Sequence, residues 1–350
     1  MAGFLSAEPQ GTGRDMAGGS IVTLLLSDSD VRAICDVGAL AAYIEDALRK
    51  EAKGSRAQLP ERMNLGHGSV FLRVMPAVLP ESGLMGLKFF HGSMKDGVRY
   101  VVAVCSLETG EVLGLIDAAF LTAARTGATS GAATRWLSRE DSSSVGVIGS
   151  GLEAETNLRA VCSVRPVTRV SVYSRSPQRR EGFAARMSES LGIEVRATAD
   201  PLSAVRGTDI VVVATNTGPD PVVAYQGAWL EPGQHVVSIG STTPWLREID
   251  TDTILGADTV VFDASLEQMG GESGDIIAVL AAHPSWRAGV SLDRVLTGEQ
   301  PGRQRPEDIT VFKSVGTAAQ DLIAAAYLLR EARLHGIGIE VADIASPRQF

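Results

Sequence analysis

The strongest structural signal in this sequence lies in Val145-Gly146-Val147-Ile148-Gly149-Ser150-Gly151-Leu152-Glu153-Ala154. This segment has the pattern GxGxxA, between an apolar run typical of a buried strand and a segment with helical periodicity. We expect Gly149 to permit a tight turn, Gly151 to let the backbone approach a pyrophosphate, and Ala154 to allow close helix–strand packing. Because free N–H groups at a helix start bind phosphates, the segment predicts a dinucleotide site. A purely structural glycine turn is the alternative.

Apolar runs and helical stripes alternate after this segment. The runs are at residues 169–173, 193–197, 209–214, 235–239 and 259–262, and the helical stripes are at 152–161 and 178–191. Runs that are apolar on both faces, such as Ile210-Val211-Val212-Val213, are typical of parallel strands covered by helices on each side. The alternation predicts an α/β fold with a Rossmann-type, doubly wound parallel sheet.

The flanking segments have a different pattern. Short apolar runs separated by turn residues predict strands at 23–26, 70–74, 86–90, 100–105, 112–116 and 309–312, and helical stripes predict helices at 39–48 and 317–334. We therefore predict that a Rossmann dinucleotide-binding domain, residues 131–316, is inserted into a second, α+β domain. Residues 21–130 and 317–350 would form this second domain, and residues 1–20 are expected to be a disordered tail.

Composition and charge exclude several classes of protein. The 350-residue chain is 45% hydrophobic and 21% charged, which is typical of a globular protein, and its length favours two domains. Its net charge of −9, from 32 basic and 41 acidic side chains, argues against a nucleic-acid partner, which requires a basic face. No apolar run reaches the ~18–20 residues of a membrane span, so we expect no membrane partner.

Cysteine usage bears on location and on metal binding. Cys35, Cys105 and Cys162 are far apart, and none of the five histidines has a second one at helical spacing. This pattern argues against a disulfide framework and against a metal site, and it predicts a reducing, cytoplasmic location. Residues 1–19 lack the apolar core of a secretory signal, which agrees with that location.

The end of the second predicted Rossmann strand bears on the choice of cofactor. An NAD site usually has an Asp or Glu here, which accepts hydrogen bonds from the ribose hydroxyls. This sequence has Ser174-Arg175-Ser176, with Arg179 one turn later. Hydroxyls and a guanidinium suit a 2′-phosphate that a carboxylate would repel, so we predict that NADP(H) is preferred and that NAD(H) is possible. The alternative is that these arginines are solvated charges on a helix surface.

Several segments resemble motifs of the ornithine cyclodeaminase/mu-crystallin family, over nearly the whole chain from about Thr23 to about Leu334. They resemble the family's lysine strand, its RTxATSxxA segment, its DxxEQ…GD[LI] stretch and its ITxFxSVG motif. The matching segments are Gly86-Leu87-Lys88-Phe89, Arg125-Thr126-Gly127-Ala128-Thr129-Ser130-Gly131-Ala132, Asp263-Ala264-Ser265-Leu266-Glu267-Gln268 with Gly274-Asp275-Ile276, and Ile309-Thr310-Val311-Phe312-Lys313-Ser314-Val315-Gly316. One difference is Gln320-Asp321, where Glu-Asp is common.

The resemblance implies a homodimer formed through the substrate-binding domain, with the nicotinamide facing a pocket between the two domains. It also implies a small amino- or imino-acid substrate and hydride transfer between the nicotinamide and the carbon that bears nitrogen. With the loop and strand-end positions above, the predicted cofactor-binding residues are Thr126, Gly149, Ser150, Gly151, Leu152, Ser174, Arg175, Ser176, Arg179, Thr215, Asn216, Thr217, Ser314, Val315 and Gly316.

An α-imino or α-amino carboxylate requires a fixed cation to orient it beside the nicotinamide. Positions that match the family motifs make Arg62, Lys88 and Arg125 the candidate substrate-binding residues. Arg125 would pair with the carboxylate, and Lys88 would bind it or, if burial lowers its pKa, donate a proton to the nitrogen. The structural alternatives are a surface charge for Arg62, a snorkelling strand residue for Lys88 and an interdomain ion pair for Arg125.

Two positions differ from what the resemblance implies for an ornithine cyclodeaminase. The acid/base aspartate two residues after Gly240 is replaced by Thr242, whose hydroxyl cannot take up a proton at neutral pH. A glutamate before the Met-Pro step is replaced by Arg73, which we expect to bind substrate and to favour an anionic or neutral substrate end over a second ammonium. Asp117 is a candidate replacement acid or, equally, a structural hydrogen-bond acceptor. The candidate catalytic residues are thus Lys88, Asp117 and Thr242.

These observations predict an NAD(P)H-dependent oxidoreductase, an imine or ketimine reductase or an amino-acid dehydrogenase that transfers hydride at the α-carbon. Two alternatives stay open. The first is an ornithine-type cyclodeaminase that releases ammonia, which Thr242 and Arg73 disfavour. The second is a non-catalytic protein of the mu-crystallin type that binds NADP and a small ligand, which the missing acid/base aspartate keeps open.

Overall fold

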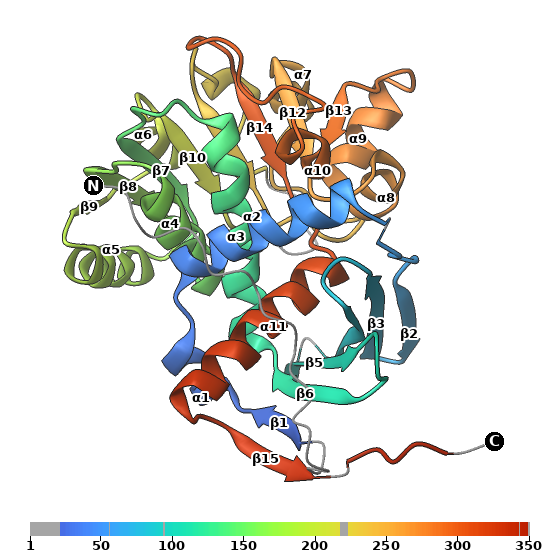
Figure 1. Cartoon of the computed structure of the whole chain (residues 1–350). Helices are drawn as coiled ribbons and strands as arrows, with labels where there is room; N and C mark the ends of the chain where they lie inside the picture. Colours follow the sequence, from blue (N-terminus) through green and yellow to red (C-terminus); the bar gives the residue numbers. More distant parts are fainter. Residues whose placement is uncertain (1–21, 56, 94, 218–222, 343, 349–350) are drawn as a thin grey trace, which may run out of the picture.

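The computed structural model describes residues 22–55, 57–93, 95–217, 223–342 and 344–348. They form two β-sheets with associated helices, which occupy the upper and lower halves of the molecule in Figure 1. The tail predicted at residues 1–20 lies outside the described residues. Within the described ranges, no helix is both long enough and apolar enough to cross a membrane.

The larger sheet has eight parallel strands in the order β13-β12-β14-β11-β10-β7-β8-β9. The chain runs outward from β7 to β9 and then returns to β10 on the other side of β7, so the strand order reverses between β7 and β10. This is the doubly wound α/β arrangement that the sequence predicts. The strands are β7 (Ser144–Ile148), β8 (Arg169–Tyr173), β9 (Glu194–Ala197), β10 (Ile210–Val213), β11 (His235–Ser238), β12 (Thr259–Phe262), β13 (Gly289–Ser291) and β14 (Thr310–Lys313).

Both faces of this sheet are buried, which explains its uninterrupted apolar strands. On β10, Ile210 and Val212 belong to one apolar core, and Val211 and Val213 belong to another on the opposite face. The first core includes residues of α4 (Leu152–Val164), α5 (Pro177–Leu191) and α10 (Leu292–Leu296). The second includes residues of α6 (Pro201–Val205), α7 (Thr251–Leu255), α8 (Leu266–Glu272) and α9 (Gly274–Ala282), and the short 3₁₀ helix η1 (Gly227–Trp229) packs against it.

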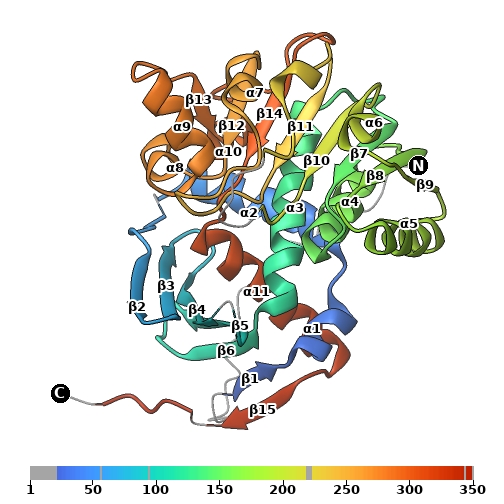
Figure 2. The same ribbon diagram turned by 180° about the vertical axis from the view of Figure 1, so that it is seen from behind.

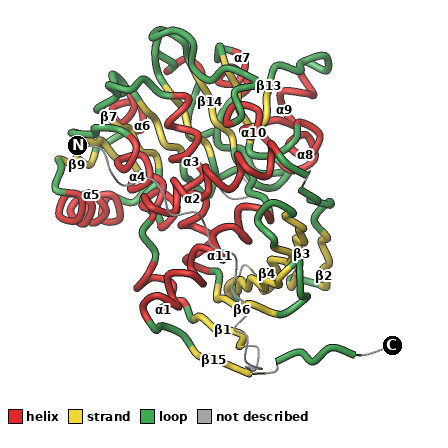
Figure 3. The backbone as a smooth tube through the Cα atoms, viewed as in Figure 1, coloured by secondary structure: helices red, strands yellow, loops and turns green. Residues whose placement is uncertain are grey.

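The smaller sheet has seven strands in the order β15-β1-β6-β5-β4-β3-β2, antiparallel except for the pair β1 and β6. Because β15 pairs with β1, the described ends of the chain meet in this sheet. Helix α11 lies between this sheet and α2, as Figure 3 shows. These elements are β1 (Val22–Leu26), α1 (Asp28–Ile34), α2 (Val37–Lys53), β2 (Met63–His67), β3 (Val70–Leu79), β4 (Leu84–Ser93), β5 (Gly97–Ser106), β6 (Val112–Asp117), α11 (Ala318–His335) and β15 (Ile339–Ala342).

Helix α3 (Ala119–Leu137) joins the two halves and passes from one to the other, as Figure 2 shows from behind. It packs closely against α4, because a Cβ on Gly127 would lie 2.5 Å from the backbone of Thr156. A Cβ on Gly131 would lie 3.0 Å from the Cβ of Ala160. Gly127 and Gly131 therefore let α3 pack directly against α4, the helix that follows the GxGxxA loop.

Candidate active site

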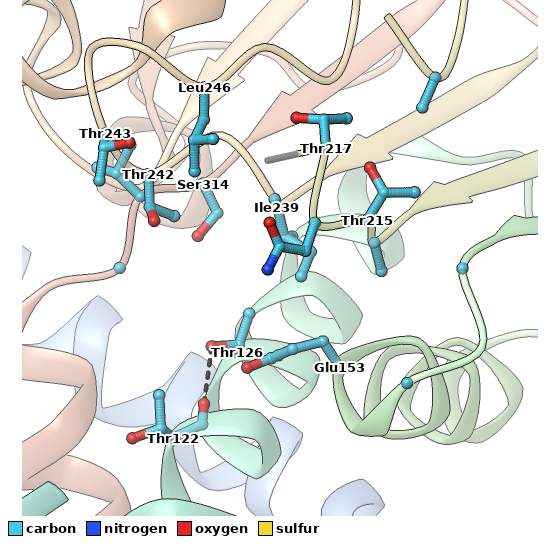
Figure 4. Close-up of a pocket in the computed structure, with 18 of the residues that line it drawn as sticks. Thr122, Thr126, Glu153, Thr215, Thr217, Ile239, Thr242, Thr243, Leu246 and Ser314 are labelled. Atoms are coloured by element: carbon cyan, nitrogen blue, oxygen red, sulfur yellow. Dashed lines mark hydrogen bonds between the residues drawn. The ribbon is translucent and has the colours of Figure 1, made fainter. Parts of the chain in front are cut away.

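A cavity of about 1820 Å³ lies between the two sheets. One wall is formed by the loops after β7, β8, β10, β11 and β14, and the opposite wall by β3, β4, β5 and the first turns of α3. Figure 4 shows Ile239 and Ser314 on one side and Thr126 and Glu153 on the other. The cavity thus lies at the carboxyl ends of the parallel strands, where doubly wound sheets bind ligands.

The GxGxxA loop forms one end of this cavity. Gly149 has a φ of 130°, and a Cβ there would lie 2.2 Å from the carbonyl oxygen of Ala214. Gly151 is the N-cap of α4, where a Cβ would meet open space and no side chain of the described residues caps the first N–H groups of the helix. The residues therefore fit a pyrophosphate, which requires a bare backbone with free donors.

The residues after β8 extend the wall beyond this loop. The hydroxyl of Ser150 donates a hydrogen bond of 2.9 Å to the hydroxyl of Ser174, which joins this segment to the GxGxxA loop. Ser176 caps α5 and accepts a hydrogen bond of 3.3 Å from the backbone N–H of Arg179. Arg175 and Arg179 are exposed and line the cavity, so this corner carries two positive charges beside three hydroxyls.

Two carboxylates hold the loops that complete this wall. Glu248 accepts hydrogen bonds from the N–H groups of Thr215 at 2.6 Å and Gly240 at 2.7 Å, and its burial raises its pKa. Asp263 accepts hydrogen bonds from the N–H groups of Val315 at 3.0 Å and Gly316 at 2.9 Å. Neither carboxylate is in our predicted site, and both act by shaping the backbone. The predicted residues that these loops and α3 bring to the cavity are Thr126, Thr215, Asn216, Thr217, Ser314, Val315 and Gly316.

Lys88 and Arg125 meet at a single carboxylate on the opposite wall. Asp321 Oδ1 lies 3.0 Å from Lys88 Nζ and 2.7 Å from Arg125 Nε, and all three side chains are buried. Burial lowers the pKa of Lys88 to about 8, although Asp321 opposes this shift. Despite its burial, Asp321 has a pKa below its usual value because Arg125 and Lys88 stabilise its charge. Both cations line the cavity, so they can bind an anion that enters it.

Arg62 and Arg73 lie further along the same wall. Arg62 donates to the carbonyl oxygen of Gly316 at 2.7 Å and forms a salt bridge of 2.7 Å with Glu272, so its charge is already matched. Arg73 donates to Asn64 at 2.5 Å, and its guanidinium lies 5.4 Å from the centroid of the Phe90 ring.

Glu153 was not predicted as a site residue, yet it lines the cavity. Its Oε2 atom is buried and has no hydrogen-bond partner among the described residues. Burial raises the pKa of Glu153 to about 7, and Arg125 and Lys88 act in the opposite direction. The sequence does contain a signal for this residue, because Glu153 is an acidic side chain within the GxGxxA segment, at the second position of α4.

The structure does not place Asp117 in the site. Its side chain is exposed at the end of β6 and accepts a hydrogen bond of 3.0 Å from the N–H group of Ala119 at the start of α3. Its proposed role as replacement acid was therefore wrong, and the structural alternative holds.

Thr242 does line the cavity (Figure 4). All other predicted site residues also line it, including Gly149, Ser150, Gly151, Leu152, Ser174, Arg175, Ser176, Arg179, Arg62, Arg73, Lys88 and Arg125.

Comparisons with known proteins agree with this architecture. The Delta(1)-pyrroline-2-carboxylate reductase of Bacillus thuringiensis subsp. konkukian is 31% identical over 329 residues, which cover 91% of this chain and 99% of the relative. The structure of the Thermococcus litoralis Delta(1)-pyrroline-2-carboxylate reductase in complex with NADH and L-proline has a TM-score of 0.84 and 33% identity, covering 91% of this chain and 100% of that one. An archaeal alanine dehydrogenase dimer with bound NAD has a TM-score of 0.82 and 29% identity, covering 92% and 99%. Residues 21–336 match the family profile, and the chain therefore belongs to the ornithine cyclodeaminase/mu-crystallin family.

Proposed function

We propose that this protein is an NAD(P)H-dependent oxidoreductase that reduces the C=N bond of an imino acid, or oxidises the corresponding amino acid, at the α-carbon. One observation carries the proposal: the buried pair Lys88 and Arg125 faces a dinucleotide-binding loop across a single cavity. The relatives named as pyrroline-carboxylate reductases support the same reaction type.

The charges on the wall favour an acidic substrate. Lys88 and Arg125 share the single carboxylate of Asp321, so two positive charges are balanced by one negative charge. A substrate carboxylate would neutralise the remaining charge beside side chains that are themselves buried. A substrate held there would lie across the cavity from the loops after β10 and β14.

The bound nicotinamide supplies or accepts the hydride. The loops that Glu248 and Asp263 hold would fix its position, and β4 and α3 would bring the clamp formed by Lys88 and Arg125 against it.

NADP(H) is the preferred cofactor in this proposal, and NAD(H) is possible. Ser174, Arg175 and Arg179 supply hydroxyls and positive charge at the end of β8, where an NAD-specific site usually has a carboxylate. The similar structures contain NADH or NAD, so the preference rests on these side chains alone.

Ornithine cyclodeamination is disfavoured by two residues of the cavity. Thr242 supplies a hydroxyl where a carboxylate would be needed to take up a proton. Arg73 adds a cation to the lining of the cavity, which would repel the second ammonium of ornithine.

The proposal includes the domain limits and a homodimer. Residues 131–316 would form the dinucleotide-binding domain, and residues 21–130 with 317–350 the domain for substrate binding and dimerisation. Met63, Leu65 and Val70 are more than half exposed on β2 and β3, which supports a partner subunit on this side of the smaller sheet. A reducing, cytoplasmic location also remains part of the proposal.

The test is an assay of the purified protein with NADPH or NADH and an imine. Delta(1)-pyrroline-2-carboxylate and mixtures of a 2-oxo acid with an amine form a suitable panel, followed by cofactor absorbance. We expect oxidation of the cofactor only when both components are present. Lys88→Met should lower kcat/KM by about 10²-fold or more, because it removes a buried charge from the clamp. The control is Lys50→Met, which affects only an exposed pair with Asp46.

Two results would contradict the proposal. NADPH binding without turnover over the whole panel would indicate a non-catalytic binding protein. Release of ammonia from ornithine, with no cofactor added and no net redox change, would indicate a cyclodeaminase.

A further inference from the structure

Glu153 is an ionisable side chain in a position where the dinucleotide loop itself requires none. It is the second residue of α4, and Figure 4 shows its side chain pointing from that helix into the cavity, toward Thr126. Its Oε2 atom is buried without a hydrogen-bond partner among the residues that the structure describes. A buried polar atom of this kind costs free energy until it is paired, so a ligand in the cavity is the natural partner.

Charged or ionisable groups from three other elements face Glu153. Arg125 of α3, Lys88 of β4 and Tyr100 of β5 all interact with it electrostatically. Both cations are already bound to Asp321, at 2.7 and 3.0 Å, and no salt bridge to Glu153 is present among the described residues. Glu153 therefore lies close to the clamp of Lys88 and Arg125 but forms no salt bridge with either cation among the described residues.

In the part of the chain that the structure describes, the other helices and strands packed on α4 bring no further charge to this end of the helix. Strands β7 and β10 contain only Ser, Gly, Val and Ile. Helix α2 meets α4 at its far end, where Gly38 lies against Ser163. On α4 itself, Glu155 forms a salt bridge of 2.9 Å with Arg159 and does not line the cavity.

These surroundings bring the pKa of the Glu153 carboxyl close to neutral pH. Burial raises its pKa to about 7, in spite of the two cations, so both forms are populated at neutral pH. A general acid or base acts best when its pKa is near the working pH. Thr242, on the other side of the cavity, has only a hydroxyl and cannot replace it.

We propose that Glu153 is the catalytic acid and base for the substrate nitrogen, an inference that rests on the function proposed above. The nitrogen and the carboxylate of an imino acid are bonded to the same carbon. A carboxyl group beside the clamp of Lys88 and Arg125 is therefore also beside the nitrogen.

The proton and electron balance is simple. In reduction, the α-carbon gains the hydride from NAD(P)H, the π bond of C=N breaks, and the nitrogen gains the proton of the Glu153 carboxyl. The imine is reduced, the nicotinamide is oxidised, and the Glu153 carboxylate regains a proton from water. In oxidation, the carboxylate of Glu153 removes a proton from the amine, the α-carbon gives its hydride to the oxidised cofactor NAD(P)⁺, and the π bond of C=N forms.

The test compares Glu153→Gln with Glu155→Gln, a matched control in the same turn of α4. For the wild type and the control, we expect kcat for imine reduction to fall, and kcat for amine oxidation to rise, as the pH increases through neutrality. Glu153→Gln keeps the shape of the side chain but cannot transfer a proton. We expect its kcat to be roughly 10²–10⁴-fold lower in both directions, without this pH dependence, while its affinity for NADPH stays close to wild type.

Two additional measurements separate the possible outcomes. Thermal melting and NADPH titration verify that Glu153→Gln is folded and binds cofactor, and Glu153→Asp, which keeps an acid, should retain a pH-dependent kcat. If the wild type reduces no imine, the proposed function itself fails. If the wild type is active and Glu153→Gln keeps its kcat and its pH profile, only the role of Glu153 is overturned. Weaker NADPH binding with an unchanged kcat at saturating NADPH would also overturn it, because Glu153 would then serve the cofactor loop.

Discussion

Lys88 Nζ lies 3.0 Å from Asp321 Oδ1, and both side chains are almost completely removed from solvent. The two residues are 233 positions apart in the chain, on β4 and α11. Arg125 of α3 reaches the same oxygen at 2.7 Å. One carboxylate therefore joins three elements and holds two cations at the cavity wall.

Asp321→Asn should destabilise the protein strongly, because it leaves Lys88 and Arg125 close together with no buried negative charge between them. Breaking a buried ion pair by removing one partner typically costs about 3–5 kcal/mol. Chemical denaturation at neutral pH measures this loss. Asp46→Asn is the control, because the pair that Asp46 forms with Lys50 is exposed. If the two variants unfolded at the same denaturant concentration, Asp321 would not hold the clamp.

The affinity for an acidic substrate should depend on the protonation of Lys88. Its pKa in the folded protein is lowered from 10.5 to about 8, so Lys88 loses its positive charge as the pH rises through about 8. We expect KM for the imino acid to increase above this pH, by up to about tenfold per pH unit. KM for NADPH serves as the internal control and should change much less.

The lowered pKa of Lys88 also determines how the stability of the folded protein changes with pH. Between about pH 8 and 10.5 the unfolded chain binds more protons at this lysine than the folded protein does. The cost of burying the ammonium is therefore complete below pH 8 and declines as the pH rises through this window. Lys88→Met should remove this contribution, together with the pH dependence of KM. A KM in the wild type that stays constant across the window would contradict the assignment of Lys88.

Arg73 should determine which substrate side chains are accepted. Its guanidinium and the ammonium of Lys88 lie 5.4 and 5.7 Å from the centroid of the same Phe90 ring, so a substrate bound at Lys88 would have a second cation nearby. We expect imino acids with an anionic or neutral side chain to be preferred over those with an ammonium group. Arg73→Glu should shift the ratio of the two kcat/KM values by about tenfold or more toward the cationic substrate. Arg99→Glu, on an exposed position of β5 outside the cavity, should leave this ratio unchanged.

Most strands of the larger sheet could be predicted closely from the sequence, but the short edge strand β13 was missed, and the run at 309–312, which we listed with the flanking segments, forms β14 inside this sheet. The run at 169–173 has the bounds of β8, and the four central residues of run 209–214 form β10. Such runs give a clear signal because helices cover both faces of the sheet, so polar residues are absent from the strands.

Helix α3 was not predicted, for a related reason. It is buried along most of its length, from Leu121 to Leu137, because it lies between both halves of the molecule and α4. A helix without a solvent-facing stripe has no amphipathic periodicity to recognise. The edge strands β2 and β15 were missed because nearly all of their residues are exposed, which removes the apolar alternation.

The site shows what proximity in sequence can and cannot predict. Asp117 is only eight residues from Arg125 in the sequence, but it lies at the end of β6 and accepts a hydrogen bond from the N–H group of Ala119. Glu153 lies inside the recognised motif, but the property that makes it unusual is burial beside Lys88 and Arg125. That property arises only when β4 and α3 are packed against α4.

The preference for NADP(H) that we propose should depend on the absence of a carboxylate at Ser174. Ser174→Asp introduces a charge that repels a 2′-phosphate and accepts hydrogen bonds from free ribose hydroxyls. We expect the ratio of the Kd values for NADPH and NADH to shift by about tenfold or more toward NADH, measured by fluorescence titration. Arg186→Asp makes a larger charge change at an exposed position of α5 outside the cavity and should not shift the ratio. Equal effects of the two variants would mean that only the general charge of this surface matters.

The close contact between α3 and α4 should make Gly127 intolerant of any side chain. A Cβ at this position would lie 2.5 Å from the backbone carbonyl group of Thr156, which cannot move without shifting α4 and the loop before it. Gly182 is a helical glycine of α5 whose added Cβ would meet nothing nearer than the flexible end of Arg186, at 3.5 Å. Alanine is a better helix former than glycine by up to about 1 kcal/mol, so Gly182→Ala should raise the melting temperature slightly.

Gly127→Ala gains the same helix propensity, but it forces two backbones apart. Overpacking of this kind typically costs 1–3 kcal/mol, so we expect net destabilisation and a lower melting temperature, opposite in sign to Gly182→Ala. Because α3 carries Arg125 and Thr126, the displacement should also misplace the clamp relative to the dinucleotide loop. We therefore expect kcat for imine reduction to fall at temperatures where the variant is still fully folded. A Gly127→Ala variant that is as stable and as active as Gly182→Ala would show that the spacing of α3 and α4 does not set the geometry of the site.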